Sequence, residues 1–126
     1  MAHPPDERVE ELLSAARTAT GDELRSLTYF TEEDVEQLYL RSDLSRTADL
    51  VGFAESERHG FHAQSLYADT QLGDYEFTVR VFENGYLTRV INNGHGVWVT
   101  TDSMDIDRFE ELASALASIL RSFDPA

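Results

Sequence analysis

Alternating apolar and polar residues mark the stretch 75–101 as β-structure. Two Asn-Gly pairs, Asn84-Gly85 and Asn93-Gly94, divide this stretch into three runs. Asn-Gly favours the two-residue type I′ hairpin turn, because both central positions of that turn need positive φ. The stretch therefore predicts a three-stranded antiparallel meander.

The register of this meander follows from its two turns. If each turn has two residues, Glu83 lies opposite Tyr86 and Asn92 lies opposite His95. One face then gathers apolar side chains from all three strands, namely Phe77, Val79, Val81, Val90, Val97 and Val99. A slip of one residue in either hairpin would mix the two faces. We therefore predict that this face packs on the core.

The opposite face of the meander combines cations with large apolar side chains. Facing arginines repel each other unless something compensates them, and this face is too apolar to be simply solvated. Either the 42–74 segment or a partner is therefore expected to cover it. We predict a partner- or ligand-binding surface here, with Arg80, Arg89 and Trp98 in one cross-strand row and Phe82, Leu87 and Ile91 beside them.

Helical periodicity marks both ends of the chain. Apolar residues at spacings of three and four predict a helix over 7–19. The same spacing from Ile106 to Phe123 predicts a strongly amphipathic helix that covers the core face, capped by Asp102 or Ser103.

The middle of the chain, residues 24–74, contains one predicted strand, one ambiguous stretch and two predicted helical pieces. Residues 24–30 have strand composition. Residues 31–41 fit either a hairpin loop leading into a strand at 35–41 or a capping box that opens a helix. We prefer the hairpin, because a strand at 24–30 needs a neighbour. Within 42–74 we expect one helical piece that ends at Gly60 and a second one over 61–67.

The predicted element order is α-ββ-α-βββ-α, an α+β domain with an antiparallel five-stranded sheet flanked by helices. Its length of 126 residues fits a single domain over 6–126 after a disordered start at 1–5. The order resembles the roadblock/longin/profilin group of small domains. The PAS sensor fold shares it. Both resemblances are topological and rest on no signature motif.

The composition of charged residues indicates the type of organism more clearly than it indicates a binding partner. There are 24 acidic residues against 10 basic ones, and all ten are arginine. An acid excess without lysine resembles proteins of salt-loving archaea. The alternative is an acidic mesophilic protein from a GC-rich genome. At 1 M salt the Debye length is about 3 Å, so the net charge of -14 acts mainly in solvation.

Several classes of partner and location are disfavoured. The arginines are spread singly along the chain, so no nucleic-acid surface is expected. No apolar run approaches the roughly 20 residues of a membrane span, and the N-terminus lacks a secretory signal pattern. We therefore expect a cytoplasmic domain that binds neither nucleic acid nor membrane.

Four strings carry a second resemblance. They are 24–30, 36–41, 82–90 and 95–102, and they resemble a haloarchaeal family of uncharacterised small cytosolic domains. This resemblance implies a halophile source and a cytosolic domain. It brings no catalytic residues.

No residue pattern in the sequence indicates a catalytic residue, a metal site or a cofactor. Cysteine is absent. His59 and His62 lack a third ligand, and no nucleophile is placed beside His95. The acidic run 102–107 fails the calcium-loop pattern, which needs glycine at its sixth position and glutamate at its twelfth. We therefore predict that the chain is not an enzyme, with catalysis through His95 as the weakest reading.

The function favoured by these observations is a regulatory or assembly module that forms a homodimer. In roadblock-like domains the sheet pairs edge to edge with a copy of itself, and the composite surface holds a partner, often a small GTPase. The resemblance thus implies a protein partner. The alternative is a PAS-like small-molecule sensor, in which 42–74 closes over the Arg80, Arg89 and Trp98 face and encloses a ligand.

Overall fold

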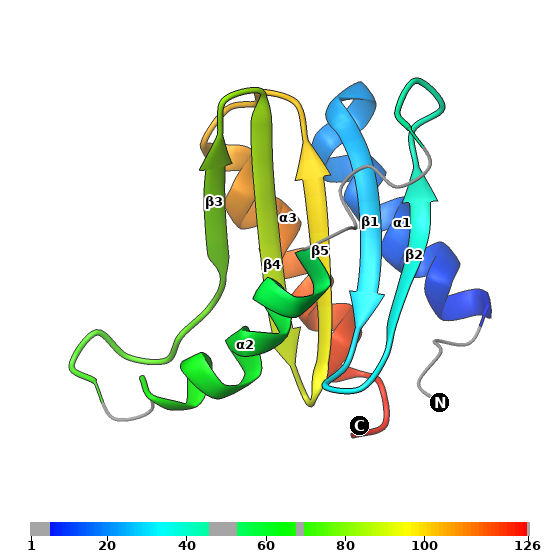
Figure 1. Cartoon of the computed structure of the whole chain (residues 1–126). Coiled ribbons are helices and arrows are strands. Elements are labelled where there is room, and N and C mark those ends of the chain that lie inside the picture. Colours follow the sequence, from blue (N-terminus) through cyan, green and yellow to red (C-terminus); the bar gives the residue numbers. More distant parts are fainter. Residues whose placement is uncertain (1–5, 46–52, 68–69, 126) are drawn as a thin grey trace.

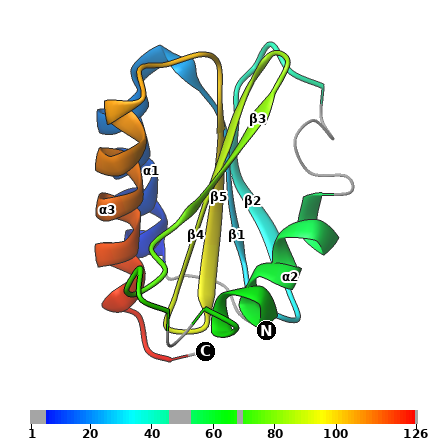
Figure 2. The same ribbon diagram turned by 90° about the vertical axis from the view of Figure 1, so that its left-hand side faces the viewer.

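A computed structural model describes residues 6–45, 53–67 and 70–125 of the chain and confirms the predicted element order. In chain order the elements are α1 (Asp6–Thr20), the 3-10 helix η1 (Gly21–Glu23), β1 (Leu24–Phe30), β2 (Val35–Leu40), α2 (Phe53–Ser65), β3 (Thr78–Phe82), β4 (Gly85–Asn92), β5 (His95–Thr101) and α3 (Asp107–Arg121). Figure 2 shows three layers, with α1 and α3 on one face of the sheet and α2 on the other.

The sheet is antiparallel throughout and has the strand order β2-β1-β5-β4-β3. The pairing of β1 with β5 joins the first hairpin to the C-terminal meander. The two edges of the sheet are therefore β2 and β3, and α2 crosses the face between them (Figure 1).

The main core lies between the sheet and the helix pair α1 and α3. The i, i+3, i+4 spacing of α3 places Leu112, Leu116 and Leu120 on one side, and all three are fully buried. They meet Val90 and Val97 from the predicted core face of the meander. Burial of such a side chain contributes about 1.5–3 kcal/mol, so this layer carries much of the stability.

The second hairpin of the meander has the predicted register. Asn92 lies opposite His95, and Asn93 and Gly94 occupy the turn with φ of 60° and 84°. Positive φ at both central positions is what a type I′ turn requires. The turn chemistry of Asn-Gly therefore decides this part of the fold.

The first hairpin is shifted by two residues from the prediction. Phe82 lies opposite Gly85, so Glu83 and Asn84 form the turn and Glu83 does not face Tyr86. The reason is tertiary: Gly85 runs so close to the carbonyl oxygen of Thr101 that a Cβ atom would overlap it. Because the shift is even, the two faces of the meander keep their residues. The prediction that Val81 packs on the core is nevertheless wrong, since Val81 is 74% exposed on the edge strand β3.

The ambiguous stretch 31–41 forms the predicted hairpin. Its turn is closed by the N–H of Thr31, which donates to the carbonyl of Asp34 at 2.9 Å, while the Thr31 hydroxyl accepts from the N–H of Asp34 at 3.1 Å. β1 lies inside the sheet and needs two neighbours, which explains why the hairpin forms instead of a helix.

Two helix boundaries differ from the prediction. One helix, α2, replaces the two expected pieces and continues through Gly60, which faces Arg89 and Ile91 so closely that a Cβ atom would overlap them. The start of the first expected piece, like the predicted disordered 1–5, lies outside the described residues.

The C-terminal helix also starts later than predicted. It begins at Asp107 and is capped by neither Asp102 nor Ser103. Asp102 is used elsewhere, since its carboxylate accepts hydrogen bonds from Arg41. Ile106 precedes the helix and is 80% exposed, so its predicted place in the core stripe is wrong.

A buried polar pair ties β1 and β5 to the C-terminal end. The Tyr29 hydroxyl donates to Nδ1 of His95 at 2.5 Å, and Nε2 of His95 donates to the carbonyl of Asp124 at 2.6 Å. The carbonyl can only accept, so Nε2 carries a proton, and in the neutral imidazole Nδ1 is then the acceptor. Both ring nitrogens of this histidine are thus engaged in structural bonds.

This pair predicts a loss of stability in alkali that depends on Tyr29. Burial, and secondarily the charge of Asp34, raises the pKa of Tyr29 above its ordinary value of 10.0. The folded state then holds a proton that the unfolded state releases. The stabilising contribution is therefore complete below pH 10 and declines as pH rises through the pKa of the folded state.

The measurement is the free energy of unfolding against pH for the wild-type protein and Tyr29→Phe. We expect the alkaline decline to be steeper in the wild type. Tyr67→Phe is the matched control, because Tyr67 is 50% exposed. Identical alkaline profiles for the wild type and Tyr29→Phe would contradict the prediction.

Candidate functional site

The predicted binding surface lies on the sheet face that α2 covers. Trp98, Leu87 and Arg89 are buried beneath this helix, with exposures of 0%, 1% and 5%. Ile91 is half-buried. The exposed part of the surface consists of Phe82 and Arg80, whose side chains lie on the edge strand β3. The role of all six residues in binding remains a prediction.

Aromatic rings fill the space between α2 and the sheet. Trp98 lies between Phe30 and Phe53, with ring centroids 5.2 and 6.5 Å away, and Phe61 meets Phe30 edge-on at 5.4 Å. Phe53 also stacks on Phe82 at 6.0 Å. The PAS-like reading would put a ligand where these rings lie, so the packing offers it no support.

Two glycines allow this close packing. Gly60 brings α2 against Arg89 and Ile91, and Gly96 leaves room for the ring of Phe30. A methyl group at either position would overlap its neighbours. Neither contact leaves a signal in the sequence, because each joins segments far apart in the chain.

An ion cluster lies beneath α2, centred on Glu57. This carboxylate is 2% exposed and accepts from Nε of Arg80 at 2.7 Å and from Nη1 of Arg89 at 3.1 Å. Nη2 of Arg89 donates to the hydroxyls of Tyr75 and Thr78 at 3.0 and 2.9 Å. The carboxylate thus compensates the two arginines that the sequence analysis expected to repel.

The predicted cross-strand row of Arg80, Arg89 and Trp98 is correct only in part. Arg89 does lie opposite Trp98, but Arg80 lies opposite Leu87. The two-residue shift of the first hairpin is the cause. Sequence analysis also missed Glu57, although its place on the apolar side of α2, three residues after Ala54, was a usable signal.

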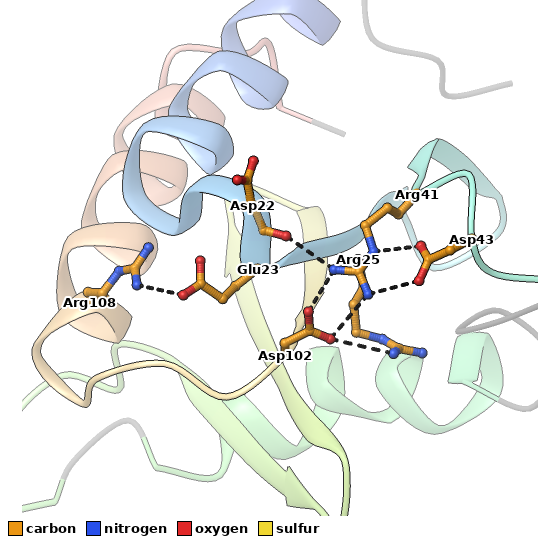
Figure 3. A network of polar contacts seen from close by, with 7 residues as sticks. All are labelled: Asp22, Glu23, Arg25, Arg41, Asp43, Asp102 and Arg108. Atoms are coloured by element: carbon orange, nitrogen blue, oxygen red, sulfur yellow. Dashed lines mark hydrogen bonds and ion pairs between the residues drawn. The ribbon is translucent and has the colours of Figure 1, made fainter.

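A second polar network lies where β1 begins and where β2 and β5 end (Figure 3). Arg41, which follows β2, donates to Asp102 at 2.7 Å and to Asp43 at 2.7 Å, and also to the carbonyl of Asp22 at 3.1 Å. Bonding to Asp102 and then Asp43 raises the pKa of Arg41, and bonding to Arg41 lowers the pKa of Asp43. The network fastens the ends of β1, β2 and β5 together.

The histidines of the described residues lie on two elements, His59 and His62 on α2 and His95 at the start of β5. His95 is buried and bonded through both nitrogens. Within residues 6–45, 53–67 and 70–125, no three histidine or acidic side chains cluster as a metal site would need. Over the same residues, no helix is both long and apolar enough to span a bilayer.

The two edges of the sheet differ in how well they could pair with another strand. β2 is disturbed by a register shift between Leu27 and Thr28 of its neighbour, and Tyr39 lies under the guanidinium of Arg17. β3 pairs with β4 without any shift, and Val81 is 74% exposed on it. Bulges and charges blunt an edge. Although β3 carries the charge of Arg80, its regular pairing makes it the better candidate of the two for pairing with another strand.

Comparison with solved structures identifies the fold. The gliding protein MglB from Thermus thermophilus matches with a TM-score of 0.65 at 16% identity, covering 94% of this chain and 93% of that one. MglB in a tetrameric arrangement gives 0.62 at 18% identity, with coverages of 94% and 92%. A roadblock/LC7 domain from Streptomyces avermitilis gives 0.57 at 13% identity, with coverages of 94% and 96%.

These matches confirm the predicted roadblock-like α+β architecture. No curated protein matches the sequence significantly. A family model, by contrast, covers most of it. Because the model described as a domain of unknown function (DUF7522) matches residues 10–121, the chain belongs to that family.

Proposed function

We propose that this protein is a non-enzymatic regulatory or assembly module that works as a homodimer and binds a protein partner. The open edge of β3 carries the proposal, since it presents Val81 and Phe82 with exposures of 74% and 49%. The roadblock-type fold supports it, as does the tetrameric arrangement described for MglB. The acidic, lysine-free composition favours the cytosol of a salt-loving cell as the place of action.

The backbone of β3 is oriented for pairing with a second copy. Phe82 and Gly85 close a two-residue hairpin, and such a closing pair exchanges its backbone hydrogen bonds. Bonding direction alternates along a strand, so the N–H and C=O groups of Val79 and Val81 point away from β4. An antiparallel second β3 would satisfy these groups and make one continuous sheet from two copies.

The partner surface in this proposal is the α2 side of the paired β3 strands. Arg80 and Phe82 contribute directly, because they are exposed there. Trp98, Leu87 and Arg89 contribute by holding α2 in place. By resemblance to roadblock-like domains, the partner is a small GTPase.

The dimer is tested by Val81→Pro. Proline removes the outward N–H of Val81 and leaves the pairing with β4 intact, because that N–H does not point to β4. We expect the wild type to sediment at twice the monomer mass of 14.2 kDa and Val81→Pro to sediment as a monomer. Two lost backbone bonds and the steric block weaken association by roughly a hundredfold.

Val81→Thr is the matched control, because it keeps the branched side chain and the N–H and should remain dimeric. Circular dichroism checks that both variants fold. A folded Val81→Pro protein that still dimerises would place the interface elsewhere, and a wild type that stays monomeric would overturn the homodimer. A GTPase partner held by the composite surface should bind the wild type and be lost with Val81→Pro.

A further inference from the structure

The Glu57 cluster carries more positive than negative charge. Its one carboxylate faces two guanidinium groups, those of Arg80 and Arg89. The other partners of Arg89 are the neutral hydroxyls of Tyr75 and Thr78. The buried Nε of Arg89 has no acceptor among the described residues. Within this cluster the cations thus outnumber the carboxylates by one, although the chain as a whole has a net charge of -14.

Arg80 carries the accessible part of this surplus. It is bonded to Glu57 through Nε, and its side chain is 44% exposed. In the described part of the chain, its two terminal nitrogens have no hydrogen-bond partner. The terminal N–H groups of a guanidinium form a planar fork that suits an oxyanion. Glu57 holds this fork in a fixed orientation on the edge strand.

The dimer proposed above would double this arrangement, and the inference rests on that proposal. β3 runs from Thr78 to Phe82, so Arg80 is its central residue. Full antiparallel overlap of two copies, with Val79 bonded to Val81 of the other copy, sets Arg80 opposite Arg80 of the second copy. Side chains directly opposite one another are only about 4.5–5.5 Å apart at Cβ, and like charges there are destabilising.

The second copy supplies no carboxylate from β3 or from the Glu57 cluster that could separate these guanidiniums. The neighbours of Arg80 on the same face of the paired strand would be Thr78 and Phe82, which are uncharged. Glu57 of each copy already has both oxygens occupied. Since neither β3 nor the Glu57 cluster offers a free carboxylate, an anion from solution can balance the positive charge at the dimer axis.

We propose that a small tetrahedral oxyanion, such as phosphate or sulfate, binds between the Arg80 side chains of two copies and stabilises the dimer. Each copy contributes two cations and one carboxylate, so a dianion neutralises the surplus of the pair. Chloride lacks the several oxygens needed to accept from both forks at once. The anion thus controls assembly of the dimer.

The test is the dimer dissociation constant, measured by sedimentation equilibrium in chloride and in inorganic phosphate at matched ionic strength. For the wild type we expect association at least tenfold tighter in saturating phosphate. Arg80→Gln should dimerise equally in both salts and at least as tightly as the wild type in chloride. Arg121→Gln, which removes an exposed arginine on α3, should keep the wild-type response.

Arg80→Lys provides a second variant that keeps the charge and loses the fork, and its phosphate response should be reduced. Equal wild-type affinities in the two salts would overturn the anion site and leave the dimer standing. A phosphate response that persists in Arg80→Gln would overturn it too, because phosphate strengthens apolar association generally. A wild type that is monomeric in both salts would overturn the dimer itself.

Discussion

Trp98→Ala is expected to lower the free energy of unfolding by about 3–5 kcal/mol, the usual cost of removing a large buried ring. Trp98 has no exposed surface and contacts both Phe30 and Phe53. Its loss would leave a cavity between the sheet and α2, and the glycine contacts on both sides limit how far the layers can collapse. Because this is the only tryptophan, unfolding should be followed by circular dichroism in urea.

Trp98→Phe is the control for shape, since it keeps an aromatic ring and should lose less stability than Trp98→Ala. Association should be compared per folded molecule. If Trp98→Ala keeps wild-type stability and loses partner binding or self-association, the side chain acts at a surface and the packing described for α2 is wrong. If stability falls and association of the folded fraction persists, Trp98 is a core residue.

Glu57→Gln is expected to cost about 3–5 kcal/mol, because it removes the one carboxylate that compensates two guanidiniums. Glu57 is 2% exposed, and the side chain of its partner Arg89 is 6% exposed. Glutamine keeps the size of the side chain but not the charge. The loss should appear as a lower urea midpoint and as weaker docking of α2 on the sheet.

Glu55→Gln is the matched control, because Glu55 lies on the same helix and is exposed. It should leave stability within about 0.5 kcal/mol of the wild type. In the double variant with Arg89→Met, the cost of Glu57→Gln should shrink, since the uncompensated buried cation is gone. Equal stability of Glu57→Gln and Glu55→Gln would contradict an essential role for the cluster.

Local patterns were enough to predict the element order and which strands pair as hairpins, whereas the pairing of β1 with β5 was not predicted. The strand at 24–30 was predicted with its observed bounds, because β-branched and aromatic residues favour a pleated, half-buried surface. Asn93-Gly94 specified the second hairpin through its backbone conformation alone. The alternation of apolar residues assigned each face of the meander, and this assignment survived the shift of the first hairpin because alternation has a period of two.

Predictions from turn and cap residues were wrong where those residues make a contact with another segment of the chain. Asn84-Gly85 has the same local signal as the second pair, yet Gly85 serves as a close-approach residue beside Thr101. Asp102 likewise looked like a helix cap and instead binds Arg41. In each case the competing partner lies far away in the sequence, so no local pattern contains it.

Periodicity and turn signals thus sufficed for the fold class, for the core face of the meander except the exposed Val81, and for a set of residues on the opposite face. The folded chain was needed to show that α2 covers most of that set, that Glu57 compensates Arg80 and Arg89, and that β2 and β3 are the edges of the sheet. The physical reason is that secondary structure follows from side-chain spacing and backbone conformation over a few residues. Compensation of a buried charge and exposure of an edge depend on contacts between segments that meet only after folding.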